Sequence, residues 1–324
     1  MNIALVSGGA GFIGSHLARA LIAQGRQVRV FDNFSSGRRA NLANLDVEIV
    51  AGDIRDGEQI QHVLKNVDVV FHQAAFISVP QSIEDPQGCF DVNIQGTLNL
   101  LEACRGTHVK KVVLASSCAV YGDSNHLPLS EDEPLSPLSP YAVSKQANEI
   151  FARLYTNLYG LPVVALRYFN VYGPRQAPDS PYAAVIPIFI HHLLEGTKPV
   201  IYGDGSQRRD FVYVEDVVRA NLLAMQVEEA AGKTINICTG HETSLLELVD
   251  ELEHIFSDPP PELKPLLAGQ HPTPARHTPA RVGDIQRSLG NPGLAAGLLG
   301  FQAQTDIHLG LCHTIAAAAA DLGR

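Results

Sequence analysis

The chain has 324 residues, 45% of them hydrophobic, which is enough for one large α/β domain or for a large domain beside a smaller one. A formal net charge of −10 argues against nucleic-acid binding, because phosphate backbones require a basic face. The five cysteines lie far apart without a CxxC pair, which argues against disulfides or zinc and fits a reducing cytoplasm. We find neither a signal peptide nor an apolar run of about 18 residues, so we expect no membrane association.

Short apolar runs alternate with stretches of helical period through the first 170 residues. The runs predict buried parallel strands, and they read IALVSG, VRVFD, VEIVAGD, VDVVFHQAA, KVVLASS and PVVALRYFN in chain order. The intervening stretches predict helices, and they read GSHLARALIAQG, GEQIQHVLKN, VNIQGTLNLLEACRG and SPYAVSKQANEIFARLYTNLYG. This alternation predicts an α/β fold with a doubly wound parallel sheet of the Rossmann type.

From residue 171 onward the pattern becomes less regular. We expect helices near Ala183–Glu195, Val214–Val227 and Ser244–Phe256, a strand at Lys233–Ile237, and the end of a C-terminal helix at Ala316–Ala320. A proline-dominated stretch over residues 257–284 predicts an irregular segment. We therefore expect a main domain over residues 1–170 and a smaller, irregular α/β lobe over residues 171–324, with segments of about 200–240 returning to the main sheet.

A glycine-rich turn follows the first predicted strand and opens a helix. Gly8, Gly11 and Gly14 permit a tight turn, a close approach of pyrophosphate, and close packing of helix on strand. Asp32 ends the second strand, where its carboxylate can accept both adenosine ribose hydroxyls and would repel a 2′-phosphate. The pattern predicts NAD rather than NADP, although Arg38 and Arg39 lie close by and weaken that preference.

Tyr141 and Lys145 stand four residues apart in a predicted helix, which places both side chains on one face. A phenol is a poor base near neutrality, because its reference pKa is about 10. A nearby ammonium group and an oxidised nicotinamide would favour the phenolate. Tyr141 could then take a hydroxyl proton while hydride leaves the same carbon.

Taken together, GGAGFIGSHL, the position of Asp32, SSCAVYG and YAVSK resemble the extended short-chain dehydrogenase/reductases, in their sugar-nucleotide epimerase/dehydratase branch. LRYFNVYGPRQ, GDGSQRRDFVYVEDV and RVGDIQRS resemble the same branch, so the resemblance covers nearly the whole chain. It implies a Rossmann domain with tightly held NAD over residues 1–170, and a C-terminal lobe that mainly binds a nucleoside-diphosphate sugar. It also implies a homodimer formed through a helix pair that includes the YxxxK helix.

The resemblance assigns roles to individual residues. The catalytic set would be Ser117, Tyr141 and Lys145. Cofactor contacts would come from Gly8, Gly11, Phe12, Ile13, Gly14, Asp32, Asn33, Ser36, Gly37, Asp53, Ile54, Gln73, Ala74, Ala75, Asn93, Ser116, Tyr141, Lys145 and Tyr168. Substrate contacts would come from Ser78, Ser117, Cys118, Tyr141, Asn170, Gln176, Ala184, Val185, Tyr202, Arg209, Arg281, Asp284 and Ser288. Among these, Asn170 and the two arginines would bind the diphosphate, and Tyr202 would stack on the uracil.

The resemblance also favours one reaction within the branch. Cys118 and Ala119 stand where its 4,6-dehydratases carry an acid pair, so a 4-epimerase is expected. Ser288 stands where a bulky Tyr would restrict related enzymes to plain hexoses. This favours interconversion of UDP-N-acetylglucosamine and UDP-N-acetylgalactosamine, with possible action on UDP-glucose and UDP-galactose.

Three other interpretations remain open from the sequence. One is a dehydratase in which Cys118 does acid/base work, and another is a non-enzymatic NAD-sensing regulator. A metal site at His191 and His192, or at His271 and His277, is disfavoured, because adjacent helical histidines point apart and the other two lie in a proline-rich loop. We therefore expect no metal.

Overall fold

The computed structural model describes residues 3–178, 184–280 and 285–323. Its centre is a parallel sheet of seven strands in the order β11-β6-β5-β4-β1-β2-β3. The strands are β1 (Ile3–Ser7), β2 (Gln27–Asp32), β3 (Val47–Ala51), β4 (Val67–His72), β5 (Lys111–Ser117), β6 (Val163–Tyr168) and β11 (Thr234–Ile237). The predicted doubly wound sheet is therefore confirmed, including the strand expected at 233–237.

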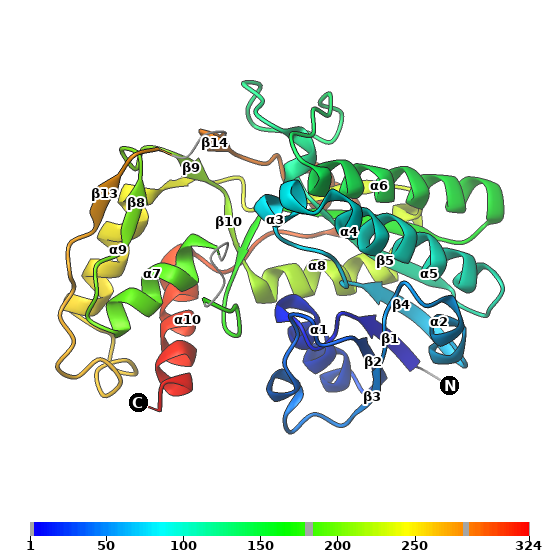
Figure 1. Ribbon diagram of the computed structural model, residues 1–324, viewed down its shortest axis with the longest axis horizontal. Helices are drawn as coiled ribbons and strands as arrows, with labels where there is room; N and C mark the ends of the chain where they lie inside the picture. The colour runs from blue at the N-terminus through cyan, green and yellow to red at the C-terminus, as the bar shows by residue number, and fades with distance from the viewer. Residues whose placement is uncertain (1–2, 179–183, 281–284, 324) are drawn as a thin grey trace.

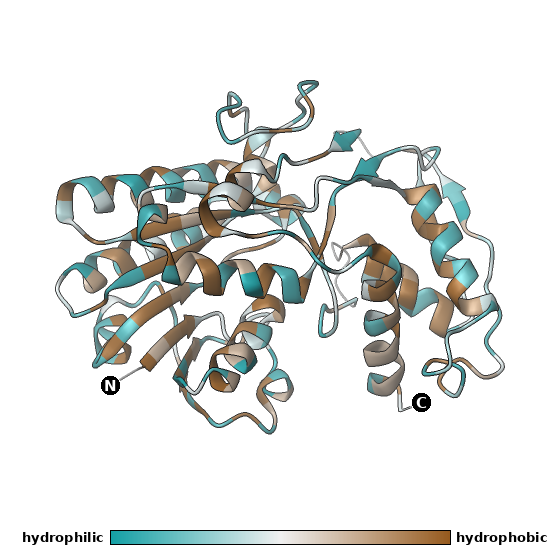
Figure 2. Ribbon diagram, turned by 180° about the vertical axis from the view of Figure 1, so that it is seen from behind, coloured by the Kyte–Doolittle hydropathy of each residue, from teal (hydrophilic) through white to brown (hydrophobic). Residues whose placement is uncertain are grey.

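Helices cover both faces of this sheet because successive strand side chains point to opposite sides. Ala4 and Val6 of β1 pack under α1 (Phe12–Ala23) and α8 (Val214–Gln226). Leu5, between them, faces α2 (Gly57–Val63), α5 (Gly96–Arg105) and α6 (Pro140–Tyr159) on the other side. Figure 1 shows these two helical layers around the sheet. Figure 2 shows the central strands mostly in hydrophobic colours.

A smaller lobe lies beside the sheet and has a hydrophobic core of its own (Figure 1). That core is built by α7 (Val185–Leu194), α9 (Leu245–Ser257) and α10 (Ile307–Asp321). Short strands form three small sheets: β7 (Asn170–Tyr172) with β10 (Phe211–Tyr213), β8 (Val200–Tyr202) with β13 (Arg276–Thr278), and β9 (Arg208–Arg209) between β12 (Thr243–Ser244) and β14 (Arg287–Ser288). The three helices predicted beyond residue 182 are present, each within about two residues of its expected bounds.

Within the segment of about 200–240, α8 and β11 join the main sheet, whereas β8 pairs with β13 in the smaller lobe. The boundary near residue 170 stays a prediction.

Two short helices, α3 (Val79–Glu84) and α4 (Pro86–Phe90), were not among the predicted elements. Each begins with a capping side chain and has a proline in its first two positions: Ser78 and Pro80 for α3, and Asp85 and Pro86 for α4. A single π-helical turn, η2 (Asp91–Gln95), precedes α5 where one continuous helix was expected. None of the helices in the described residues is long and apolar enough to span a membrane.

Candidate active site

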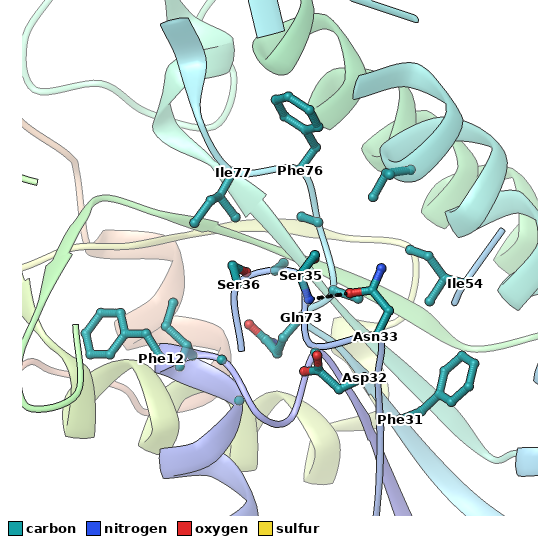
Figure 3. A pocket seen from close by; sticks show the side chains of 18 of the residues that line it. Phe12, Phe31, Asp32, Asn33, Ser35, Ser36, Ile54, Gln73, Phe76 and Ile77 are labelled. Atoms are coloured by element: carbon teal, nitrogen blue, oxygen red, sulfur yellow. Dashed lines mark hydrogen bonds between the residues drawn. The ribbon is translucent and has the colours of Figure 1, made fainter. Parts of the chain in front are cut away.

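A cavity of about 430 Å³ opens at the carboxyl ends of the sheet strands, beside the N-terminus of α1. In doubly wound sheets this edge is where ligands bind. Figure 3 shows Phe12, Asp32, Gln73 and Phe76 around the cavity. Most residues expected at the cofactor line it, namely Gly8, Gly11, Phe12, Ile13, Gly14, Asp32, Asn33, Ser36, Asp53, Ile54, Gln73, Ala74, Ala75, Ser116, Tyr141, Lys145 and Tyr168.

The glycine turn has the shape of a phosphate cradle. Gly8 has φ +70°, and a Cβ there would lie 2.5 Å from the backbone nitrogen of Ala74. A Cβ on Gly14 would lie 2.2 Å from the carbonyl oxygen of Gly8. Gly11 begins α1 without a side-chain cap, so the first amides of the helix are available to an anion.

Asp32 is held by its own loop at the rim of the cavity. Its carboxylate accepts hydrogen bonds from the backbone amides of Ala10 (2.9 Å) and Phe34 (2.8 Å). Both oxygens retain capacity for ribose hydroxyls, because each carboxylate oxygen can accept more than one hydrogen bond. Gly37 does not line the cavity but packs behind Asp32, where a Cβ would lie 3.0 Å from Oδ1.

Asp53 is already engaged within the protein. The Arg55 guanidinium donates two hydrogen bonds to its carboxylate, at 2.9 and 2.7 Å, and the Arg55 backbone amide donates a third at 2.9 Å. The side-chain amide of Asn33 donates a fourth at 2.9 Å. The Arg55 bonds, aided by Asn33, hold the pKa of Asp53 far below its usual range. Asp53 lines the cavity as an anion, and it braces Asn33 there.

Two buried polar residues that sequence reasoning missed lie next to residues that line the cavity. Asn221 of α8 is fully buried and accepts hydrogen bonds from Tyr168 Oη (2.9 Å) and Gln73 Nε2 (3.3 Å). His72 is buried between Ser7 (2.6 Å) and Thr97 (2.9 Å). In both cases the sequence offered one signal of a buried polar contact, namely a polar residue among apolar neighbours.

Asn93 lies behind the cavity rather than in its wall. Its side chain accepts a hydrogen bond from the backbone amide of Phe76 (2.7 Å) and donates to the Phe76 carbonyl (3.0 Å) and to Ser144 (2.9 Å). The residue therefore ties the turn after β4 to α6.

The predicted reactive residues come together at one side of the cavity. Ser139 and Pro140 begin α6, which places Tyr141 and Lys145 one turn apart. Lys145 Nζ lies 5.8 Å from the centre of the Tyr141 ring and donates a hydrogen bond to the Ala115 carbonyl at 2.9 Å. Ser117, at the end of β5, lies close enough to Tyr141 for its hydroxyl to oppose the rise in the pKa of the phenol.

Burial sets the protonation of this pair. It raises the pKa of Tyr141 to about 12, against the opposing effect of the Ser117 hydroxyl. It lowers the pKa of Lys145 to about 8, although Cys89 and Glu149 act in the opposite direction. The protein alone therefore favours a neutral phenol, and a further positive charge is required to favour the phenolate.

Several residues expected at the substrate contact or pair with one another near Ser117. Ser288 Oγ lies 4.0 Å from Cys118 Sγ, and Ser288 pairs with Arg209 across β14 and β9. Asn170 donates to the carbonyl of Asp210, the residue after Arg209, at 3.0 Å. Burial raises the pKa of the Cys118 thiol to about 11, which makes it a poor nucleophile.

The remaining substrate candidates are distributed along the lobe. Gln176 lines the cavity, Ser78 caps α3, Ala184 and Val185 begin α7, and Tyr202 is 37% exposed on β8. Arg281 and Asp284 lie outside the described residues. Within the described ranges, no three His, Cys, Asp or Glu side chains gather as metal ligands would.

Residues 4–238 match the model of the NAD dependent epimerase/dehydratase family. The chain belongs to this family. NAD is therefore the cofactor of this family member, and the glycine cradle and Asp32 are suited to hold it.

Several relatives of known name align with almost the whole length of this chain. A UDP-glucose 4-epimerase of Mycolicibacterium smegmatis is 40% identical over 317 residues, which are 96% of each chain. A UDP-glucose 4-epimerase structure from Thermotoga maritima, with UDP-glucose, has a TM-score of 0.89 at 37% identity and 99% coverage of both chains. A UDP-N-acetylglucosamine 4-epimerase structure from Methanobrevibacter ruminantium has a TM-score of 0.88, with 37% identity and 99% coverage of both chains.

Substitution of Gly14 by Ala tests the cradle. The added methyl group would meet the Gly8 carbonyl, so we expect unfolding to become easier by about 1–3 kcal/mol and NAD affinity to fall. Gly57→Ala is the matched control, because a Cβ there meets nothing within 4 Å. Thermal unfolding and NAD titration would measure both effects, and equal behaviour of the two variants would contradict the assignment.

Proposed function

We propose that this family member is a UDP-sugar 4-epimerase that prefers UDP-N-acetylglucosamine and UDP-N-acetylgalactosamine and also acts on UDP-glucose and UDP-galactose. The observation that carries the proposal is that Tyr141 and Lys145 line the cofactor cavity with Ser117 beside Tyr141, without a carboxylic acid at the two positions after Ser117. Tight retention of NAD is part of the proposal, since the reaction regenerates the cofactor.

NAD, when bound, supplies a reversible hydride acceptor for C4 of the sugar. Tyr141 takes the proton of the 4-hydroxyl as C4 becomes a carbonyl, and it returns that proton after the sugar has turned within the pocket. Ser117, beside Tyr141, hydrogen-bonds the same sugar hydroxyl and helps to move its proton. Lys145 holds the cofactor ribose, and its positive charge favours the phenolate.

The residues beside Ser117 favour epimerisation over elimination. A dehydratase must protonate a leaving hydroxyl, and a carboxylic acid suits that task. Cys118 carries a thiol whose pKa burial raises to about 11, and Ala119 carries no acid. Cys118 and Ser288 both have small side chains, which favours a sugar with an N-acetyl group at C2.

The test is incubation of the purified protein with each of the four UDP-sugars, without added cofactor. NMR of the sugar ring would report the configuration at C4. We expect equilibration of both N-acetylated sugars and slower equilibration of the plain hexoses. A keto or unsaturated product would establish a dehydratase instead, and no turnover even with added NAD would refute the proposal.

We further propose that the protein forms a homodimer through α6. Five apolar side chains are exposed along this helix, namely Val143, Ile150, Leu154, Leu158 and Tyr159. Four of them lie on one stripe, because positions 143, 150, 154 and 158 share a helical face.

The cysteines are free thiols, in keeping with the cytoplasmic location that we infer.

Placing charges on this stripe should separate the subunits. We expect the double variant Leu154→Glu/Leu158→Glu to be monomeric by light scattering, since a buried unpaired charge opposes association. Leu309→Glu, at a similarly exposed leucine of α10, should leave the oligomeric state unchanged. A wild-type protein that is monomeric at micromolar concentration would refute the dimer.

A further inference from the structure

A buried carboxylate lies one helical turn beyond Lys145. Glu149 of α6 is 7% exposed, and it accepts hydrogen bonds from Arg167 Nε and Nη2, both at 2.8 Å. Ser116 Oγ donates to the same carboxylate at 2.6 Å. Arg167 is 4% exposed, so a complete ion pair is enclosed behind the reactive residues.

This ion pair joins the ends of the strands that carry the reactive set. Ser116 precedes Ser117 on β5, and Arg167 precedes Tyr168 on β6. Arg167 Nη1 also donates to Tyr121 Oη at 2.7 Å, at the end of the turn after Ser117. Tyr121 in turn donates to Asn236 Oδ1 on β11 at 2.7 Å, so the network reaches three neighbouring strands.

Stability alone does not account for such a pair. Removing two charges from water costs several kcal/mol each, and buried ion pairs can often be replaced by apolar side chains without loss. The position of the carboxylate, beside Lys145 and bonded to the neighbour of Ser117, suits a role in the reactive set.

We propose that Glu149 is a positioning residue: it fixes the end of β5 against α6 and keeps Lys145 in its cationic form. The proposal rests on the proposed function only for its kinetic consequences. The positioning and the charge effect are properties of this chain whatever its sugar substrate.

The groups around Lys145 show why this carboxylate matters. Among the described residues, the titratable groups that interact with it are Cys89 of α4, His72 of β4, and Tyr141 and Glu149 of α6. The cation of Arg167 on β6 is bonded to Glu149. Burial lowers the pKa of His72 to about 3 and raises the pKa values of Cys89 and Tyr141, so these three are uncharged near neutrality. Strand β5 contributes only the Ala115 carbonyl. Glu149 is thus the negatively charged member of this group, and the Arg167 cation bonded to it offsets part of its effect on the Lys145 proton.

The direct test is NMR titration of Lys145 in protein labelled at the ε carbon of lysine and saturated with NAD. The chain has only seven lysines, and Lys145→Arg would assign the signal. We expect Glu149→Gln to lower the pKa of Lys145 by about 0.5–2 pH units, the size expected for one charge about 6 Å away in a partly screened interior. The alkaline limb of the kcat–pH profile should move down by the same amount, with little change in KM.

Tyr121→Phe is the matched control, because it removes a hydrogen bond of the same network without removing a charge. It should lower thermal stability but leave the Lys145 titration in place. If Glu149→Gln fails to fold, Glu149→Gln/Arg167→Met leaves neither charge without its partner. It should shift the pKa of Lys145 in the same direction but by less, because the Arg167 cation is removed as well.

An unchanged Lys145 titration in the folded Glu149 variants, or an equal shift in Tyr121→Phe, would overturn the proposal. A wild-type protein that turns over no UDP-sugar would instead refute the proposed function, and the NMR titration would still decide the role of Glu149.

Discussion

Replacing Tyr141 with Phe should lower kcat for C4 epimerisation by about 10²–10⁴-fold, the usual contribution of a general base. In the proposed mechanism the phenolic oxygen takes and returns the proton, whereas the ring, which lines the cavity, is preserved in the variant. NAD content and KM should therefore change little. Progress curves followed by NMR, with bound NAD measured by absorbance, would check each expectation.

The protonation of the pair adds a pH signature. Burial raises the pKa of Tyr141 to about 12, so the phenol is protonated in the protein alone. The cation of Lys145 favours the phenolate only while Lys145 keeps its proton, and burial lowers its pKa to about 8. The wild-type rate should consequently fall as pH rises through about 8.

Tyr159→Phe is a suitable control, because Tyr159 is the last residue of the same helix, 18 residues beyond Tyr141. It should retain wild-type turnover. A Tyr141→Phe protein with more than about a tenth of the wild-type kcat would refute the role of Tyr141 as the base.

Local patterns predicted much of this molecule. Apolar runs located the strands because a parallel sheet is buried on both faces. The glycine spacing and Asp32 located the cofactor end of the cavity, since both follow directly from a strand, a turn and a helix. The four-residue spacing of Tyr141 and Lys145 sufficed to place them on one face of α6.

Contacts between distant segments could not be predicted in the same way. Arg167 stands inside an apolar strand, and a buried cation requires a partner. The sequence does not say which of many carboxylates supplies it, and the partner is Glu149, 18 residues earlier. Asn221 poses the same problem, because Tyr168 and Gln73 lie 53 and 148 residues away.

Ser288→Tyr should convert the protein into an enzyme restricted to plain hexoses. Ser288 is 8% exposed on β14, and its hydroxyl lies 4.0 Å from Cys118 Sγ, next to Ser117. A phenol at this position would fill the space that we assign to the N-acetyl group. We expect kcat/KM for UDP-N-acetylglucosamine to fall about 10- to 100-fold, because overpacking costs about 1–3 kcal/mol.

Activity on UDP-glucose should survive in this variant, since a hydroxyl at C2 needs no such space. Ser288→Ala, which stays small, should keep both activities and thereby separates the volume of the side chain from its hydroxyl. Parallel NMR assays with the two sugars give the ratio of kcat/KM values directly. If Ser288→Tyr lowers both activities equally, the residue supports the site without selecting the sugar. If wild-type protein turns over only the plain hexoses, the space beside Ser288 does not receive the N-acetyl group.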